Sequence, residues 1–403
     1  MFSGYYSSFS KLRHLDWASL FFQLILLAIG LVFIYGTGAR LGGGYATKWF
    51  KQLLWITGGS FIFMTCALID YRKLGDQSWI LYFLEIVLLV WVIAKGKNIN
   101  NAQSWIAIGG LTIQPSEFAK PATLLFMSWA ITRPGWRNSV VPSWLIAGVI
   151  LLPPLILVLL QPDMGTMLVF LPFTFCIAFI KGLQWRWILL TALVGALCAP
   201  ILFTHLAPHQ QARIKVFLDA PATSLIAAAT PFVSPEQAKK WNDAHEAFFK
   251  SKKIDTWNAE QSLLSVGSGG LTGKGFMEGT QYLLGYLPRP VSPTDFIFSV
   301  IAEESGFVGS GFVILMIVCV ILCSCRTAIL AADEMGMCLA LGTAAILATH
   351  AFVNIAMTIQ AAPIIGIPLP FISYGGSFMF TTLALTGLCQ SVHIRRHEHS
   401  LYS

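Results

Sequence analysis

Asp295 is the residue of this chain whose position most favours proton chemistry. It stands in segment 293–298 (PTDFIF), where a polar stretch meets a long apolar run. Partial removal from water raises the pKa of a carboxylate and makes it a better proton acceptor near neutral pH. The alternative is that Asp295 or Thr294 caps the helix that follows. From the residue types alone the two interpretations are equal.

A second pair of charges lies in segment 114–120 (QPSEFAK). Glu117 and Lys120 stand three residues apart and therefore share one face of a helix. They can neutralise each other, because an unpaired charge at membrane depth costs about 2.5–3.5 kcal/mol. An ion pair between helices and a contact with substrate are the two interpretations.

Asp163 interrupts two apolar runs in segment 161–166 (QPDMGT). Its carboxylate is favoured at the positive N-terminal end of the helix that follows, so capping is the simpler interpretation. Binding of a cation or a sugar is the alternative.

Glycines cluster in segment 267–275 (GSGGLTGKG), which contains Ser268 and Lys274. Such a run lets backbone N–H groups converge on an anion, and Lys274 adds positive charge. The spacing differs from that of a P-loop. Phosphate binding and a tight structural turn are both consistent with the pattern.

Two prolines and three glycines in segment 366–377 (GIPLPFISYGGS) forbid a continuous helix around Ser373. Irregular backbone at membrane depth is tolerated only against protein or a water-filled cavity. This segment is therefore expected to form the wall or floor of a cavity.

The elements that carry these residues are apolar runs long enough to cross a membrane. The chain is 56% hydrophobic and 11% charged, which makes a soluble domain improbable. A spanning helix needs about 20 apolar residues, and we expect an all-α polytopic membrane protein with about ten such helices in a single domain, 1–403. The expected spans are 17–36, 49–69, 78–94, 113–132, 143–160, 166–181, 186–204, 296–322, 335–360 and 371–392.

The distribution of charge predicts the orientation. With both termini in the cytoplasm, more basic residues fall on the cytoplasmic side than on the outside, as the positive-inside rule requires. The inner set is Lys11, Arg13, Arg72, Lys73, Arg133, Arg137, Lys181, Arg186, Arg326, Arg395 and Arg396, and the outer set is Arg40, Lys48, Lys51, Lys95 and Lys97. Orientation explains the net charge of +7 better than a nucleic-acid partner does, because the basic residues are scattered.

The connection 205–294 is then extracytoplasmic, between the seventh and eighth spans. Ser234 as N-cap, Pro235 and Gln237 begin a short amphipathic helix, which we expect to lie on the membrane surface. Lysines at 239, 240, 250, 252 and 253 would face anionic lipid, polymer or solvent.

These motifs together resemble the SEDS family, the RodA and FtsW proteins of bacterial cell-wall synthesis, over nearly the whole chain. The resemblance rests on Trp49 with Gln52, 114–120, 162–166, 211–214 (QARI), 261–262 (QS) with 267–270, 294–298 and 366–377. The short terminal tails are more similar to the elongation branch of the family than to the division branch.

The resemblance implies a lipid II polymerase of the bacterial inner membrane that works with a class B penicillin-binding protein. It implies that Asp295 is the catalytic residue. Candidate substrate-binding residues are Glu117, Lys120, Asp163, Arg213, Gln261, Ser268, Lys274 and Ser373. Among them, Arg213, Lys274 and Lys120 are candidates to stabilise a departing diphosphate. A divalent cation would serve the same purpose, but no ligand cluster in the sequence specifies one.

The chain departs from the family pattern in two places. Segment 287–295 (LPRPVSPTD) is two residues longer than the usual Leu-Pro-Glu-x-His-Thr-Asp and lacks its Glu and His, and segment 219–260 is longer than expected. A lipid flippase or transporter and a non-catalytic scaffold are the rival functions, since they too would use intramembrane charges and broken helices.

Overall fold

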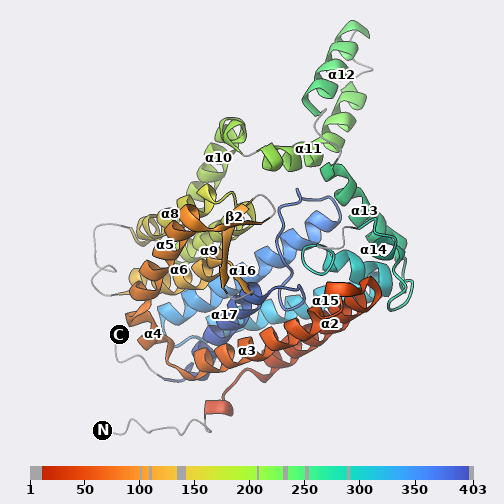
Figure 1. Ribbon diagram of the computed structural model, residues 1–403. Coiled ribbons are helices and arrows are strands. Elements are labelled where there is room, and N and C mark those ends of the chain that lie inside the picture. The colour runs from red at the N-terminus through yellow and green to blue at the C-terminus, as the bar shows by residue number, and fades with distance from the viewer. Residues whose placement is uncertain are drawn as a thin grey trace, which may run out of the picture.

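The computed structural model describes residues 11–99, 102–108, 111–133, 142–206, 208–229, 235–249, 254–287 and 291–398, and these are mostly helical (Figure 1). A helix occupies each of the expected spans, which confirms the predicted all-α polytopic fold. They are α2 (Trp17–Leu41), α3 (Lys48–Leu68), α5 (Ser78–Lys95), α6 (Pro115–Thr132), α8 (Ser143–Leu160), α9 (Met164–Ile180), α10 (Trp185–His205), α15 (Ile297–Ile329), α16 (Glu334–Thr358) and α17 (Gly376–Ile394).

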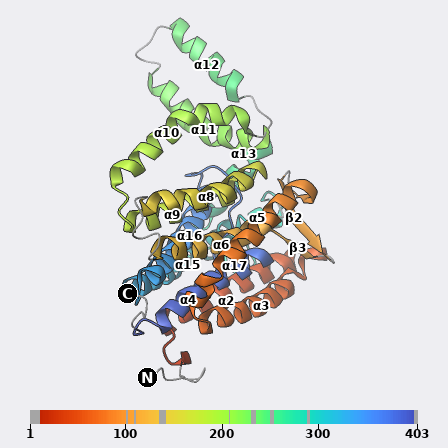
Figure 2. The same ribbon diagram turned by 90° about the vertical axis from the view of Figure 1, so that its left-hand side faces the viewer.

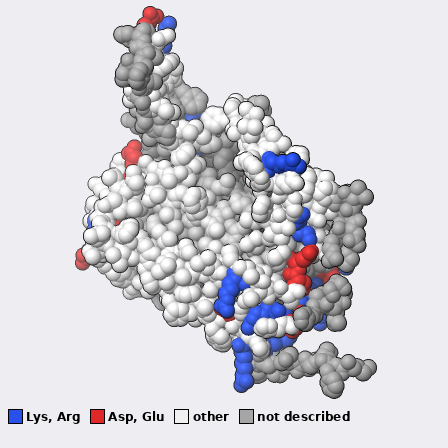
Figure 3. Space-filling view, turned by 180° about the vertical axis from the view of Figure 1, so that it is seen from behind, with Lys and Arg blue, Asp and Glu red and all other residues white. Residues whose placement is uncertain are grey.

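The outer surface of the bundle is suited to lipid. Within the described residues, α2, α5, α8, α15 and α16 are long and apolar enough to cross a membrane, and α9 and most of α10 are shorter apolar helices. One broad face of the molecule carries few Lys, Arg, Asp or Glu side chains, and those it shows gather toward its edges (Figure 3). The chain is therefore a multi-pass membrane protein.

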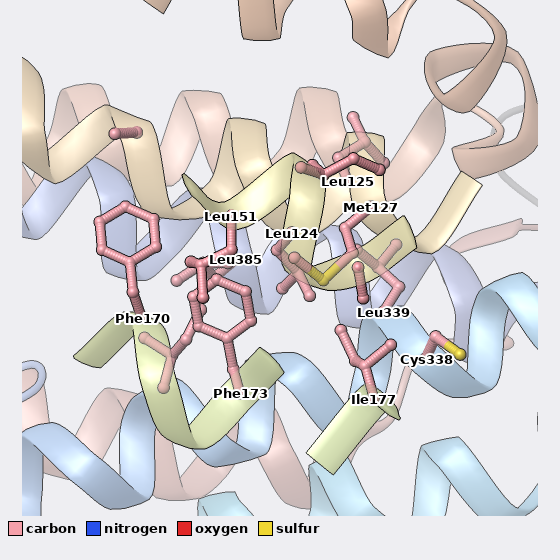
Figure 4. Close-up of a cluster of buried hydrophobic side chains, with 14 of the residues drawn as sticks. Leu124, Leu125, Met127, Leu151, Phe170, Phe173, Ile177, Cys338, Leu339 and Leu385 are labelled. Carbon is pink, nitrogen blue, oxygen red and sulfur yellow. The ribbon is translucent and has the colours of Figure 1, made fainter. Parts of the chain in front are cut away.

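α16 lies at the centre of the bundle and packs against α6, α9, α15 and α17. Side chains from several of these helices meet there, among them Leu124, Phe173, Leu339 and Leu385, all of which are buried (Figure 4). Close packing of this kind fixes the relative positions of the helix ends.

The two chain termini lie at the same end of the bundle. The Gln390 side chain accepts a hydrogen bond from the N–H of Asp16 (2.9 Å) and donates one to the carbonyl of Asp16 (3.1 Å). Arg396 donates to the carbonyl of His14 (3.2 Å). Because α17 ends here, its first turn lies at the opposite end. The start of α15 lies near it, since the N–H of Tyr374 donates to the carbonyl of Pro293 (2.9 Å).

A small antiparallel sheet follows α5, where the sequence analysis expected only a short outer loop. Its strands are β1 (Lys97–Ile99), β2 (Ala102–Ile108) and β3 (Leu111–Ile113), in the order β1-β2-β3. Ile106 pairs with Ile113 in this sheet. The strands are short, and period-2 alternation is a weak signal over so few residues.

The long connection after α10 is more helical than expected. It contains α11 (Pro208–Ala229), α12 (Pro235–Phe249), α13 (Ile254–Ser268) and α14 (Thr280–Leu283). α12 projects away from the bundle in both views (Figures 1 and 2), whereas α13 packs on α15. The expected helix near 234–249 is thus present, with Ser234 and Lys250, Lys252 and Lys253 outside the described residues; its place on a membrane surface stays a prediction.

Two short elements complete the described part of the chain. A 3₁₀ turn, η1 (Gly43–Tyr45), joins α2 to α3, and α4 (Tyr71–Asp76) joins α3 to α5. Both lie in tight connections, so α2, α3 and α5 follow one another with short links, as in most helical bundles.

Candidate active site

A cavity of about 350 Å³ lies at the end of the bundle opposite the termini. It is bounded by the first turns of α6, α9 and α17, by the small sheet, by α11 and by the segment before α15. Ionisable side chains from four of these regions face it. The lining includes Trp55, Ser104, Trp105, Thr112, Gln114, Glu117, Asp163, Thr166, Gln210, Arg213, Thr294, Asp295, His350, Gly366 and Tyr374.

Asp295 stands at this cavity, just before α15 begins. The N-cap of α15 is Phe296, which makes no side-chain capping hydrogen bond. The carboxylate lies against Gly366, where a Cβ atom would come within 3.3 Å of Oδ2 of Asp295. Gly366 also has φ 76°, a conformation that other residues rarely adopt. The close approach to Asp295 and this backbone conformation both favour glycine at position 366. Because Phe296 and not Asp295 is the N-cap of α15, the structure does not favour the capping interpretation of Asp295.

Burial raises the pKa of Asp295 to about 6, although the positive charge of Arg213 and a hydrogen bond from Thr294 oppose the rise. A carboxylate with this pKa is about nine-tenths ionised at pH 7 and is more basic than an exposed aspartate. It is therefore able to accept a proton from a hydroxyl group brought into the cavity.

Arg213 reaches the cavity from α11, the first helix of the long connection. One turn earlier, Gln210 donates a hydrogen bond to the carbonyl of Pro162 (3.0 Å), which ties α11 to the turn between α8 and α9. The structure thus brings together Arg213 and Asp295, which are 82 positions apart in the printed sequence. A cation facing the base is suited to hold an anionic group of a substrate.

Asp163 both caps a helix and lines the cavity. Its carboxylate accepts hydrogen bonds from the N–H of Thr166 (3.0 Å), at the start of α9, and from the Thr166 hydroxyl (2.9 Å). Gln114 and Ser116, at the start of α6, each donate to it at 2.8 Å. With four donors already in place, Asp163 chiefly joins two helix ends at the cavity wall.

Glu117 and Lys120 pair with each other within α6, and not between helices as one interpretation had it. Nζ of Lys120 is 2.7 Å from Oε2 of Glu117 and 2.9 Å from Nε2 of His350. Lys120 is fully buried behind the wall, while Glu117 and His350 line the cavity. His350 was not predicted from the sequence, because a single histidine within the apolar α16 has no informative spacing.

In the glycine-rich segment 267–275, the donors that would have to face a phosphate group are bonded to other parts of the protein. The N–H groups of Lys274 and Gly275 donate to the carbonyls of Glu303 and Glu304, both at 3.0 Å. Nζ of Lys274 is 2.6 Å from Oε1 of Glu303. These donors are used within the protein, which favours the interpretation of the segment as a structural turn packed on α15.

This turn is coupled to a kink in α15 at Gly306, where φ is 66°. Beyond the kink, the N–H of Phe307 donates to the carbonyl of Gly270 (2.8 Å) and that of Val308 to Leu271 (3.1 Å). A Cβ atom on Gly306 would collide with the backbone of Leu271 and Gly273. The glycines here permit close approach of two backbones.

Three other candidate substrate contacts are not among the residues that line the cavity. Gln261 and Ser268 are on α13, which packs against α15, and the Ser268 hydroxyl donates to the carbonyl of Ser265 (3.0 Å). Ser373 is fully buried, and its hydroxyl donates to the carbonyl of Thr294 (2.7 Å). Ser373 therefore supports the segment that carries Asp295. Residues 288–290, in the altered family motif, lie outside the described residues.

Two tryptophans of the lining were also missed. Trp55 comes from α3 and packs its ring at 4.8 Å from that of Tyr374, and Trp105 comes from β2. Both sit among apolar neighbours in the sequence, so residue type alone does not separate them from lipid-facing tryptophans.

No group of three or more His, Cys, Asp or Glu side chains among the described residues is arranged to hold a metal ion. The described part of the chain therefore identifies no ligand set for the divalent cation considered from the sequence. The chemistry available from its own side chains is proton abstraction by Asp295 beside a fixed positive charge on Arg213.

The fold and this cavity define a class: a multi-pass helical membrane protein with a cavity at one end of the bundle and a basic carboxylate in the cavity wall. Residues 17–398 match the model of the FtsW, RodA and SpoVE family, described as cell cycle protein, and the chain belongs to this family.

Named relatives extend over nearly the same length. The chain is 30% identical to the peptidoglycan glycosyltransferase RodA of Treponema pallidum (strain Nichols), covering 94% of this chain and 98% of the relative. It is 32% identical to the peptidoglycan glycosyltransferase MrdB of Escherichia coli (strain K12), covering 95% and 94%.

Solved structures share the fold. One, described under structural coordination of polymerization and crosslinking by a peptidoglycan synthase complex, superimposes with a TM-score of 0.70 at 25% identity, covering 95% of this chain and 99% of the other. A mutant of the rod shape determining protein RodA of Thermus thermophilus superimposes with a TM-score of 0.65 at 25% identity, covering 95% and 99%.

Proposed function

We propose that this protein is a peptidoglycan glycosyltransferase that polymerises lipid II into glycan strands during cell-wall elongation. The observation that carries the proposal is Asp295, a carboxylate with a raised pKa that lines the same cavity as the positively charged Arg213. The relatives in Treponema pallidum and Escherichia coli, which bear the name peptidoglycan glycosyltransferase, support the same assignment.

In the proposed reaction, the 4-hydroxyl oxygen of the acceptor GlcNAc attacks the anomeric carbon of the donor MurNAc. The new C–O bond forms as the bond to undecaprenyl diphosphate breaks, and the anomeric configuration inverts from α to β. Asp295 takes the hydroxyl proton, a step that contributes typically about 10²–10⁴ in rate.

Arg213 is the best candidate to stabilise the negative charge on the departing diphosphate. It lines the cavity together with Asp295, whereas the other two candidate cations are already paired. Lys274 is bound to Glu303, and Lys120 is bound to Glu117. Glu117 and Asp163 contribute polar surface to the cavity, where hydroxyl groups of the sugars would bind.

The protein is proposed to reside in the bacterial inner membrane with both termini in the cytoplasm and the cavity facing outside. Support comes from the charge bias of the sequence and from the meeting of the two terminal segments through Gln390 and Asp16. In this orientation the connection 205–294 is extracytoplasmic, and lipid II would enter from the outer leaflet.

The partner is proposed to be a class B penicillin-binding protein. The similar solved structure described as part of a peptidoglycan synthase complex supports an assembly of polymerase and crosslinking enzyme. On α15, Gly311 has open space at its Cβ position, so a helix of the partner would be able to approach this face closely.

The test is a reconstitution of purified protein with lipid II in detergent micelles. Formation of glycan polymer there supports the enzyme, because transport between two compartments has no meaning in a micelle. A flippase predicts no polymer. A scaffold also predicts none, and predicts in addition that neutral substitution of Asp295 leaves growth intact wherever the protein still assembles.

A further inference from the structure

Asn354, on the central helix α16, joins the two segments that meet at the cavity. Its side-chain Nδ2 donates one hydrogen bond to the backbone carbonyl of Asp295 (2.9 Å) and one to that of Ile367 (2.6 Å). Asp295 carries the proposed base, and Ile367 belongs to the irregular segment that forms the opposite wall. One carboxamide thus fixes the distance between the base and that wall.

The orientation of the Asn354 amide is determined by its surroundings. Both atoms that it meets at Nδ2 are carbonyl oxygens, which accept hydrogen bonds and cannot donate. Turning the amide over would place its own oxygen against both carbonyls, so the two N–H bonds must point toward them. Asn354 is 0% exposed and lies behind the cavity wall, so it acts without touching substrate.

The backbone carbonyls of Pro293, Thr294 and Asp295 each accept a hydrogen bond from a more distant part of the chain. The Ser373 hydroxyl donates to Thr294 (2.7 Å), and the N–H of Tyr374 donates to Pro293 (2.9 Å). These two bonds come from the loop itself and move with it. Asn354 is different, because it comes from a rigid, buried helix and so fixes both segments relative to the core of the bundle.

We propose that Asn354 is a positioning residue of the catalytic centre, which sets the place of the Asp295 carboxylate relative to the wall formed by residues 366–377. The inference rests on the proposed glycosyltransferase function. A displacement of about 1 Å at a catalytic group costs on the order of 10²-fold in rate, so the loss of both hydrogen bonds should appear in the chemical step.

The test uses the purified full-length protein with lipid II. Asn354→Leu keeps much of the volume and removes both donors; Asn354→Asp keeps the shape and places a carboxylate against two carbonyls. We expect kcat to fall about 10- to 100-fold in both variants, while KM for lipid II changes by less than about twofold. We also expect the acid limb of the pH profile of kcat to shift, because the surroundings of Asp295 change.

The matched control is Gln390→Leu. Gln390 is also a buried carboxamide with two hydrogen bonds to the backbone, but both go to Asp16, at the terminal end of the bundle. The Gln390→Leu variant should have lower thermal stability than wild type and an unchanged kcat in its folded form. An effect of the Asn354 variants on stability alone, with wild-type kcat and an unshifted pH profile, would overturn the proposal.

Two further outcomes are decisive. If neither Asn354 variant yields folded protein, and Asn354→Ser and Asn354→Gln also fail, the residue serves folding and the proposal is overturned. If wild-type protein makes no polymer, the proposed function fails instead, which is distinguishable because the wild-type arm is measured first. Partial recovery of kcat in Asn354→Gln, which restores a donor, would support positioning.

Discussion

At the scale of single residues, burial gives Asp295 its chemistry. An exposed aspartate is a weak base at neutral pH, whereas the pKa of about 6 matches the base to the conditions in which it would work. The charge of Arg213 limits the rise, so that the carboxylate is still ionised at pH 7. Gly366, which has no Cβ atom, lies against the carboxylate.

Asp295→Asn should remove polymerisation. Asparagine has nearly the same shape but cannot accept a proton at neutral pH, so activity should fall by about two orders of magnitude or more. Since Phe296 occupies the N-cap position, Asp295→Ala should be similarly inactive and still folded. Glycan product from the two purified variants is the measurement, and near-normal activity of Asp295→Asn would mean that another group is the base.

The pH dependence follows from the same carboxylate. Because the ionised form is active, kcat should decline as the pH falls through about 6, and by about tenfold per unit below it. The folded state binds this proton more tightly than the unfolded state, so protonation stabilises the fold between pH 6 and 4. Asp295→Asn should therefore be at least as stable as wild type at pH 7, as thermal unfolding in detergent would show.

At the scale of elements, α15 is held by the turn that precedes α14. Glu303 is fully buried, and its Oε1 accepts from Nζ of Lys274 (2.6 Å) and from the N–H of Thr280 (2.7 Å). The same turn satisfies backbone groups on both sides of the Gly306 kink. The position of the kink, and with it the start of α15 at the cavity, depends on this contact.

Lys274→Met should destabilise the protein by about 1–3 kcal/mol, because it leaves a buried carboxylate without its cation. Glu303→Gln in the same chain removes that charge and should recover part of the loss. Unfolding midpoints of the two single variants and the double variant give the coupling energy. Additive effects would mean that the ion pair contributes nothing to holding the turn.

The exposed face of α15 is the place to test the proposed partner. Gly311→Leu should fold normally, because a Cβ atom at this position meets no atom within 4 Å, but it should weaken co-purification with the penicillin-binding protein. Gly148→Leu is the matched control, since Gly148 on α8 is equally open. Equal retention of the partner by both variants would move the interface away from α15.

At the scale of the whole molecule, the cavity and the chain termini lie at opposite ends of the bundle. Both ends of the chain are joined through the hydrogen bonds between Asp16 and Gln390. The long connection, with α11 to α14, lies at the cavity end and beyond it (Figure 1). A single determination of sidedness therefore decides where the reaction takes place.

Single cysteines in a background without the native ones report that sidedness. Asn242→Cys, on the exposed surface of α12, should react with an impermeant thiol reagent in intact spheroplasts. Lys73→Cys, exposed on α4 near the chain termini, should react only after lysis. The reverse pattern would invert the topology and place the cavity on the cytoplasmic side.

The sequence by itself determined the helical architecture, because an apolar run of about 20 residues has few alternatives to a spanning helix. It also identified Asp295 and the irregular segment 366–377, since charge, proline and glycine within apolar runs are costly and local. The ion pair of Glu117 with Lys120 followed from helical spacing. These features depend on residues that are close together in the sequence, so they are visible in the sequence itself.

The tertiary structure decided which of these residues share a space. Arg213 and Asp295 line one cavity because Gln210 ties α11 to the turn before α9. Trp105 reaches the same cavity from β2 and His350 from α16, and Asn354, also on α16, supports its wall. Lys274 illustrates the opposite case: its glycine-rich surroundings were consistent with either an anion site or a structural turn, and the structure shows its backbone N–H and its ammonium group bonded to Glu303. Local sequence specifies which groups can donate or accept, and only the packing of helices specifies which partner each group finds.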